Sequence, residues 1–145
     1  MIRELNTGEE QLHSYLRIVD LLIEVRDARV PASCEDPLFE RLASRRERVL
    51  VLSQADLACP DTTARWCMVL GKQGYPVFHM DLKHGTGLGV LKNYFKRFPG
   101  KRSRRSRRRS LPGGSQPLRA MVIGVPNTGK SSLINRLAGH RRARV

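Results

Sequence analysis

Acidic side chains are absent from residues 82–145 of this sequence. All 13 aspartates and glutamates lie at or before Asp81, whereas residues 96–145 carry 15 lysines and arginines. The formal net charge of +14 therefore belongs to the second half of the chain. A surface of that sign attracts polyanions such as nucleic acid, and the attraction is independent of base sequence.

Other shortages exclude several classes of protein. The three cysteines, Cys34, Cys59 and Cys67, show no CxxC spacing and no paired histidines, which argues against a zinc site or a disulfide framework. No apolar stretch approaches the ~20 residues of a membrane span, and the N-terminus lacks the apolar core of a secretory signal. We therefore expect a cytoplasmic protein with no membrane partner, and the 145 residues suffice for one ordinary domain.

Apolar runs and helical patterns alternate along the chain. Branched apolar runs predict strands at 19–25, 48–53, 76–80 and 118–124. Helices are predicted near 7–17, over 36–44, from a cap at Asp61 to about Lys72, from Thr86 to Phe98, and from Lys130 onward. This alternation predicts an α/β fold with a mostly parallel sheet.

Residues 99–117 interrupt the alternation. Seven of the nine residues from Lys101 to Arg109 are basic, and proline and glycine flank them. Such a segment buries too little apolar surface to fold alone, so we predict a basic flexible linker that joins residues 1–98 to residues 118–145 of one domain. Without interleaved aromatic residues, it is suited to phosphate contacts rather than to base stacking.

The stretch GVPNTGKSS, residues 124–132, matches the pattern GxxxxGK[ST]. An apolar strand is predicted before it and an amphipathic helix after it, as this motif requires. Its backbone N–H groups and the helix N-terminus bind phosphates, while the lysine reaches the terminal phosphates and the serine hydroxyl ligates Mg²⁺. The predicted phosphate-binding residues are Asn127, Thr128, Gly129, Lys130, Ser131 and Ser132, with Ser131 as the metal ligand.

Three segments together resemble the circularly permuted GTPases of ribosome assembly, most closely the RbgA/YlqF group. They are DARVP at 27–31, SQADL at 53–57 and GVPNTGKSSLINRLAG at 124–139. The resemblance implies a G domain, a three-layer P-loop NTPase sandwich, in which the guanine-specificity motif precedes the P-loop. The sequence ends at Val145, before the family's switch and DxPG segments, so we expect an incomplete domain, a fragment or truncated product, whose P-loop strand lies at an unpaired edge.

The resemblance also assigns residues to base recognition. Asp56 stands where the family's aspartate accepts hydrogen bonds from the guanine N1–H and exocyclic amine. Ser53 and Gln54 replace the family's asparagine and lysine, which weakens the contacts to the base. The backbone of Leu82 and Lys83 is the expected contact beneath the base, and the implied cofactors are GTP and Mg²⁺.

The function implied by the resemblance is GTP binding in assembly of the large ribosomal subunit. The partners would be a guanine nucleotide and ribosomal RNA or the pre-ribosomal large subunit; the sequence predicts no oligomeric state. Hydrolysis is left open, no catalytic residue is assigned, and Asp27 is interpreted as structural or ribosome-facing. Two alternatives remain: a nucleotide-independent RNA-binding or interaction module with a vestigial P-loop, and a permuted ATPase or kinase.

Overall fold

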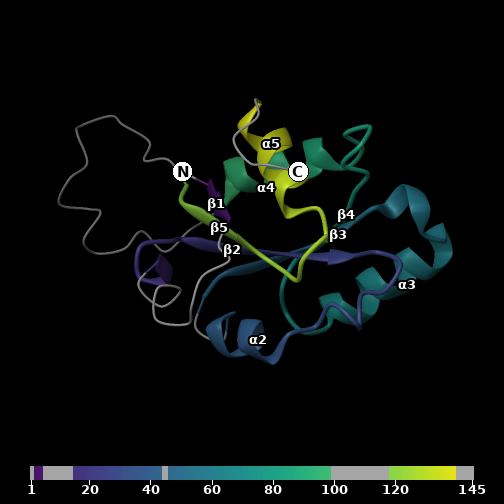
Figure 1. Cartoon of the computed structure of the whole chain (residues 1–145), viewed down its shortest axis with the longest axis horizontal. Coiled ribbons are helices and arrows are strands. Elements are labelled where there is room, and N and C mark those ends of the chain that lie inside the picture. Colours follow the sequence, from purple (N-terminus) through teal and green to yellow (C-terminus); the bar gives the residue numbers. More distant parts are fainter. Residues whose placement is uncertain (1, 5–14, 44–45, 99–117, 140–145) are drawn as a thin grey trace.

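Five parallel strands form one sheet in the order β1-β5-β2-β3-β4 (Figure 1). The computed structural model describes residues 2–4, 15–43, 46–98 and 118–139. The strands are Ile2–Glu4 (β1), Leu21–Asp27 (β2), Arg48–Ser53 (β3), Val77–His79 (β4) and Ala120–Ile123 (β5). The four predicted strands are present, and β1 is an addition to them.

Helices cover both faces of this sheet, which makes three layers. They are Pro37–Ala43 (α2), Pro60–Gly71 (α3), Leu88–Arg97 (α4) and Lys130–Ala138 (α5). Leu91 of α4 and Leu133 of α5 pack on one face, whereas Leu42 of α2 and Leu70 of α3 pack on the other. Every residue of β2, β3 and β5 is buried, as expected for parallel strands covered on both sides. The predicted α/β class is confirmed.

Two predicted helix starts were wrong by one or two residues. Helix α3 begins at Pro60 after Cys59, and Asp61 lies inside its first turn rather than at the cap. Proline fits the first helical position because its φ is already helical and its missing N–H would have no partner there. Helix α4 follows Gly87, not Thr86; a Cβ on Gly87 (φ 86°) would lie 2.6 Å from the carbonyl oxygen of His79.

The first predicted helix, near 7–17, lies mostly outside the described residues. Of that range, the structure describes only the last part, where Tyr15 and Leu16 are helical and Leu16 is buried against the α2 face of the sheet. The predicted linker at 99–117 also lies outside the described residues. The division of the chain into 1–98, 99–117 and 118–145 therefore stays a prediction.

The P-loop strand β5 is not at an unpaired edge, contrary to expectation. It pairs with β2 on one side and with β1 on the other, where Ile2 is opposite Ala120 and Glu4 is opposite Val122. The three residues of β1 were too short a run to be predicted as a strand. Their pairing satisfies backbone groups of β5 that would otherwise be available for intermolecular association.

Residues about 100 apart in sequence join where β2 and β5 begin. The Arg119 N–H donates to the Asp20 carboxylate at 3.0 Å, and the Asp20 N–H donates to the Arg119 carbonyl at 2.8 Å. The two parts of the chain therefore share one sheet and one core. Within the described ranges, no helix has the length and apolar character needed to cross a bilayer.

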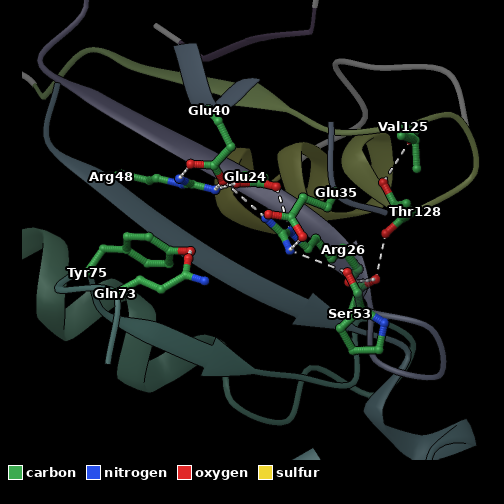
Figure 2. Close-up of polar contacts among 11 residues, drawn as sticks. Glu24, Arg26, Glu35, Glu40, Arg48, Ser53, Gln73, Tyr75, Val125 and Thr128 are labelled. Carbon is green, nitrogen blue, oxygen red and sulfur yellow. Dashed lines mark hydrogen bonds and ion pairs between the residues drawn. The ribbon is translucent and has the colours of Figure 1, made fainter. Parts of the chain in front are cut away.

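Four charged side chains, two from β2, one from β3 and one from α2, are linked by hydrogen bonds on one face of the sheet (Figure 2). Glu24 accepts hydrogen bonds from both arginines: Arg26 donates to one carboxylate oxygen at 2.6 Å, and Arg48 donates to the other. Arg48 also donates to the two carboxylate oxygens of Glu40, at 2.9 and 2.7 Å. Burial alone would lower the pKa of Arg48, but its hydrogen bonds to Glu40 and Glu24 raise it. Because Arg26 is 1% exposed and Glu24 is fully buried, removal of one partner leaves an uncompensated buried charge.

Replacement of the buried carboxylate tests this network. We expect Glu24→Ala to lower the free energy of unfolding by about 3–5 kcal/mol, measured by urea denaturation, because two buried guanidiniums lose the buried carboxylate that they share. The matched control is Glu35→Ala, whose carboxylate is 50% exposed and lies 4.0 Å from Arg26; its cost should stay below about 1 kcal/mol. Equal losses of stability in the two variants would contradict the network's role.

Candidate nucleotide-binding site

The P-loop leaves β5 at Gly124 and enters α5 at Lys130. Gly124 has φ 150°, and a Cβ there would lie 2.4 Å from the carbonyl oxygen of Val25, because the loop passes directly over β2. Gly129 has φ 90°, and its Cβ would lie 3.3 Å from Cδ1 of Leu82. Both glycines are therefore required by backbone conformation and by close approach of neighbouring segments.

The lysine of the motif folds over its own loop. Lys130 is 6% exposed, and its Nζ donates to the Val125 carbonyl at 2.9 Å. The Thr128 hydroxyl donates to the same carbonyl at 2.9 Å (Figure 2). The Lys130 ammonium thus lies against the loop that leads into the N-terminus of α5, and a helix N-terminus favours the binding of phosphate. Ser131 follows in the first turn of α5, and its hydroxyl oxygen is of the type that Mg²⁺ accepts as a ligand.

The predicted base-binding turn contacts the P-loop. The Ser53 hydroxyl donates to the Thr128 carbonyl at 2.5 Å (Figure 2), and the Gln54 amide donates to the Asn127 carbonyl at 3.4 Å. Gln54 has φ 55° and leads into a 3-10 turn, Ala55–Leu57, that carries Asp56 on the surface. The two residues that depart from the family's pattern are thus the ones that hold the turn against the P-loop.

A second loop, residues 81–87, lies beside this turn. Oxygens of Asp56 and Asp81 and a ring nitrogen of His84 all lie within 4.8 Å of one another. The Asp81 carboxylate accepts hydrogen bonds from the N–H groups of Lys83 at 2.8 Å and His84 at 3.0 Å, and it contacts the His84 imidazole. Partial burial would raise the pKa of Asp81, but these hydrogen bonds lower it, so Asp81 holds the loop as a carboxylate.

These contacts distinguish the two residues predicted to reach the base. The Lys83 N–H is already bonded to Asp81. Among the described residues, the Leu82 N–H donates no hydrogen bond. Of the predicted pair, Leu82 is therefore the one whose backbone donor is not already used within the described part of the chain. Asp81 and His84 were not predicted, although an aspartate two residues before a lysine N–H is a common turn signal.

The Asp27 carboxylate is paired with Arg29, two residues further along the same turn. Its carboxylate accepts hydrogen bonds from the Arg29 N–H at 2.9 Å and from the Arg29 guanidinium at 3.0 and 2.7 Å. The side-chain hydrogen bond from Arg29 is the main cause that lowers the pKa of Asp27. This pairing favours the structural interpretation of Asp27 over a role as a metal ligand.

The fold and the loop together define a P-loop nucleotide-binding domain of permuted order, and comparisons with known proteins agree. A family of sequences described as "50S ribosome-binding GTPase" matches residues 119–145. The chain is 31% identical over 138 residues to ribosome biogenesis GTPase A of Priestia megaterium, with 95% of this chain and 48% of that protein covered. It is 36% identical over 132 residues to mitochondrial ribosome-associated GTPase 1 of Bos taurus, with 90% and 38% covered.

A solved structure is similar as well. The crystal structure of GNP-bound YlqF from Thermotoga maritima aligns with a TM-score of 0.65 at 30% identity, covering 92% of this chain and 48% of that one. The chain belongs to the YlqF/RbgA-like family of ribosome biogenesis GTPases, as the sequence motifs predicted. It spans between 38% and 48% of the length of these three proteins.

A methyl group on the first P-loop glycine tests the loop geometry. We expect Gly124→Ala to destabilise the fold by about 1–3 kcal/mol, because the new Cβ meets a backbone oxygen and the φ is strained. The control is Gly89→Ala in α4, where a Cβ meets nothing within 4 Å; it should stabilise the helix by up to about 1 kcal/mol. Thermal unfolding measures both, and a neutral Gly124→Ala would contradict the close approach to β2.

Proposed function

We propose that this chain binds a guanine nucleotide with Mg²⁺ between its P-loop and two base-side loops. The observation that carries the proposal is the convergence at Gly129, whose Cβ position lies 3.3 Å from the Leu82 side chain and 3.6 Å from Ser53. Phosphate-binding and base-binding segments therefore form one site. Ser131 would hold the Mg²⁺, which neutralises phosphate charge when bound. No residue is assigned to hydrolysis.

Guanine is the base that fits this pair of loops. Its N1–H and exocyclic amine donate toward a carboxylate, which Asp56 supplies, and its 6-oxygen accepts from an N–H, which Leu82 supplies. Adenine reverses the polarity at its 6-position and has no N1–H. Charge-assisted hydrogen bonds to Asp56 are the stronger part of this discrimination.

Exchange of the carboxylate for an amide tests the base specificity. The wild-type chain should bind GDP more tightly than ADP, and Asp56→Asn should lower the affinity for GDP by about tenfold to a hundredfold. The same variant should gain affinity for xanthosine diphosphate, whose 2-oxygen accepts a hydrogen bond from the new amide. Competition against a fluorescent nucleotide measures both constants, with Asp61→Asn in the first turn of α3 as the control. Wild-type affinity that is equal for GDP and ADP would overturn the proposal.

We further propose that the basic segment engages ribosomal RNA, with the pre-ribosomal large subunit as the partner. The support is the charge, since residues 96–145 contain 15 basic residues and no acidic one. Relatives whose names refer to the ribosome point the same way. A nucleotide-independent RNA-binding module is the second candidate, and the same charge favours it.

Neutralisation of the segment separates these candidates. With Arg104, Arg105, Arg107, Arg108 and Arg109 changed to glutamine, the salt dependence of RNA affinity should flatten, by about 0.7–0.9 in log–log slope for each phosphate that an arginine no longer neutralises. Changing Arg65 and Lys72 of the α3 region to glutamine should leave the slope unchanged. An unchanged slope in the first variant would rule out the segment as the RNA-binding element. RNA affinity that ignores both GDP and Lys130→Ala would favour the nucleotide-independent module.

A further inference from the structure

Arg136 of α5 reaches the loop that follows β4. Its Nε donates to the Leu82 carbonyl at 2.9 Å, and its Nη2 donates to the Lys83 carbonyl. The guanidinium also lies 3.7 Å from the Cβ position of Gly85. A side chain of α5, the helix that follows the P-loop, therefore binds the backbone of the 81–87 loop, which is proposed to contact the base.

Two consecutive peptide groups of this loop are held at both ends. In the peptide between Leu82 and Lys83, Arg136 binds the carbonyl and Asp81 binds the N–H. In the next peptide, between Lys83 and His84, Arg136 again binds the carbonyl and Asp81 again binds the N–H. The Leu82 N–H belongs to the peptide before these two, and on its other side the Asp81 N–H donates to the Thr86 carbonyl at 3.1 Å. Held groups on both sides therefore restrict the orientation of the Leu82 N–H.

The same helix carries the groups that bind phosphate. Arg136 follows Lys130 by six residues, which is about 9 Å along a helix. The buried Leu82 side chain packs toward Gly129 at the start of that helix. A base held by the loop and a polyphosphate held by the helix thus share one rigid support.

We propose that Arg136 is a positioning residue for base recognition, which sets the loop so that the Leu82 N–H meets the 6-oxygen of a purine. This inference rests on the proposed binding of a guanine nucleotide. It predicts that Arg136 affects only ligands with an oxygen at that position. GDP and inosine diphosphate have this oxygen, whereas ADP and pyrophosphate do not.

Calorimetric titration of the full chain with these four ligands tests the proposal. Arg136→Ala should lower the affinities for GDP and inosine diphosphate equally, by about threefold to tenfold, because the neutral hydrogen bond from the Leu82 N–H to the 6-oxygen is misplaced. Its affinities for ADP and pyrophosphate should stay at the wild-type values. Arg136→Lys, which retains one donor, should recover part of the loss, and the control Arg119→Ala, which removes an arginine paired with Asp20, should change none of the four. Uniform weakening of all four ligands by Arg136→Ala would show a purely structural role and overturn the proposal.

Hydrogen exchange in the nucleotide-free chain tests, independently of nucleotide binding, whether Arg136 holds the 81–87 loop in place. Arg136→Ala should speed exchange of the Lys83 and His84 amides, while Arg119→Ala should not. Unchanged exchange would overturn the inference whatever the nucleotide affinities are. If the wild type does not prefer GDP over ADP, the proposed function is wrong. Faster exchange in Arg136→Ala would then show only that Arg136 holds the loop, without a role in base recognition.

Discussion

The close approach of three segments at Gly129 is the constraint on which the site depends. Ser53 ends β3, Leu82 follows β4, and Gly129 follows β5, so this approach brings together the carboxyl ends of three parallel strands. In open α/β sheets ligands bind at this edge, because the loops that leave the strands there are free to vary. A Cβ at Gly129 would be strained at φ 90° and would lie 3.3 Å from the Leu82 side chain, so the proposed base-binding and phosphate-binding segments approach this closely because the residue is glycine.

Position in the sheet, rather than order in the chain, builds this edge. The P-loop strand is the last strand in sequence, yet it lies between β1 and β2. Its neighbours hold it through backbone pairing and through the Asp20–Arg119 contact. A permuted gene order therefore yields the same juxtaposition of loops, because parallel strands need only a connection long enough to return to the starting edge.

Much of the fold could be predicted from sequence because its signals are local. Branched apolar runs identify four strands, and the spacing of Gly124, Gly129 and Lys130 identifies the P-loop. Asp56 came only from resemblance, since a lone aspartate in a turn has no local signature. Strand β1 and the hydrogen bonds from Arg136 to the 81–87 loop were not predicted, because both depend on partners more than 50 residues away in the sequence. An arginine that binds backbone carbonyls also places no requirement on the side chains of its partner residues.

An amide-resolved NMR titration with GDP and Mg²⁺ is the most direct test of the single composite site. If the two loops and the P-loop form one site, GDP shifts the amides of Leu82 and of residues 127–131 together in one saturable transition, whereas pyrophosphate shifts the amides of 127–131 and leaves the Leu82 amide unchanged. A GDP titration that shifts the P-loop amides without the Leu82 amide, or that shifts neither, would rule out a single composite site.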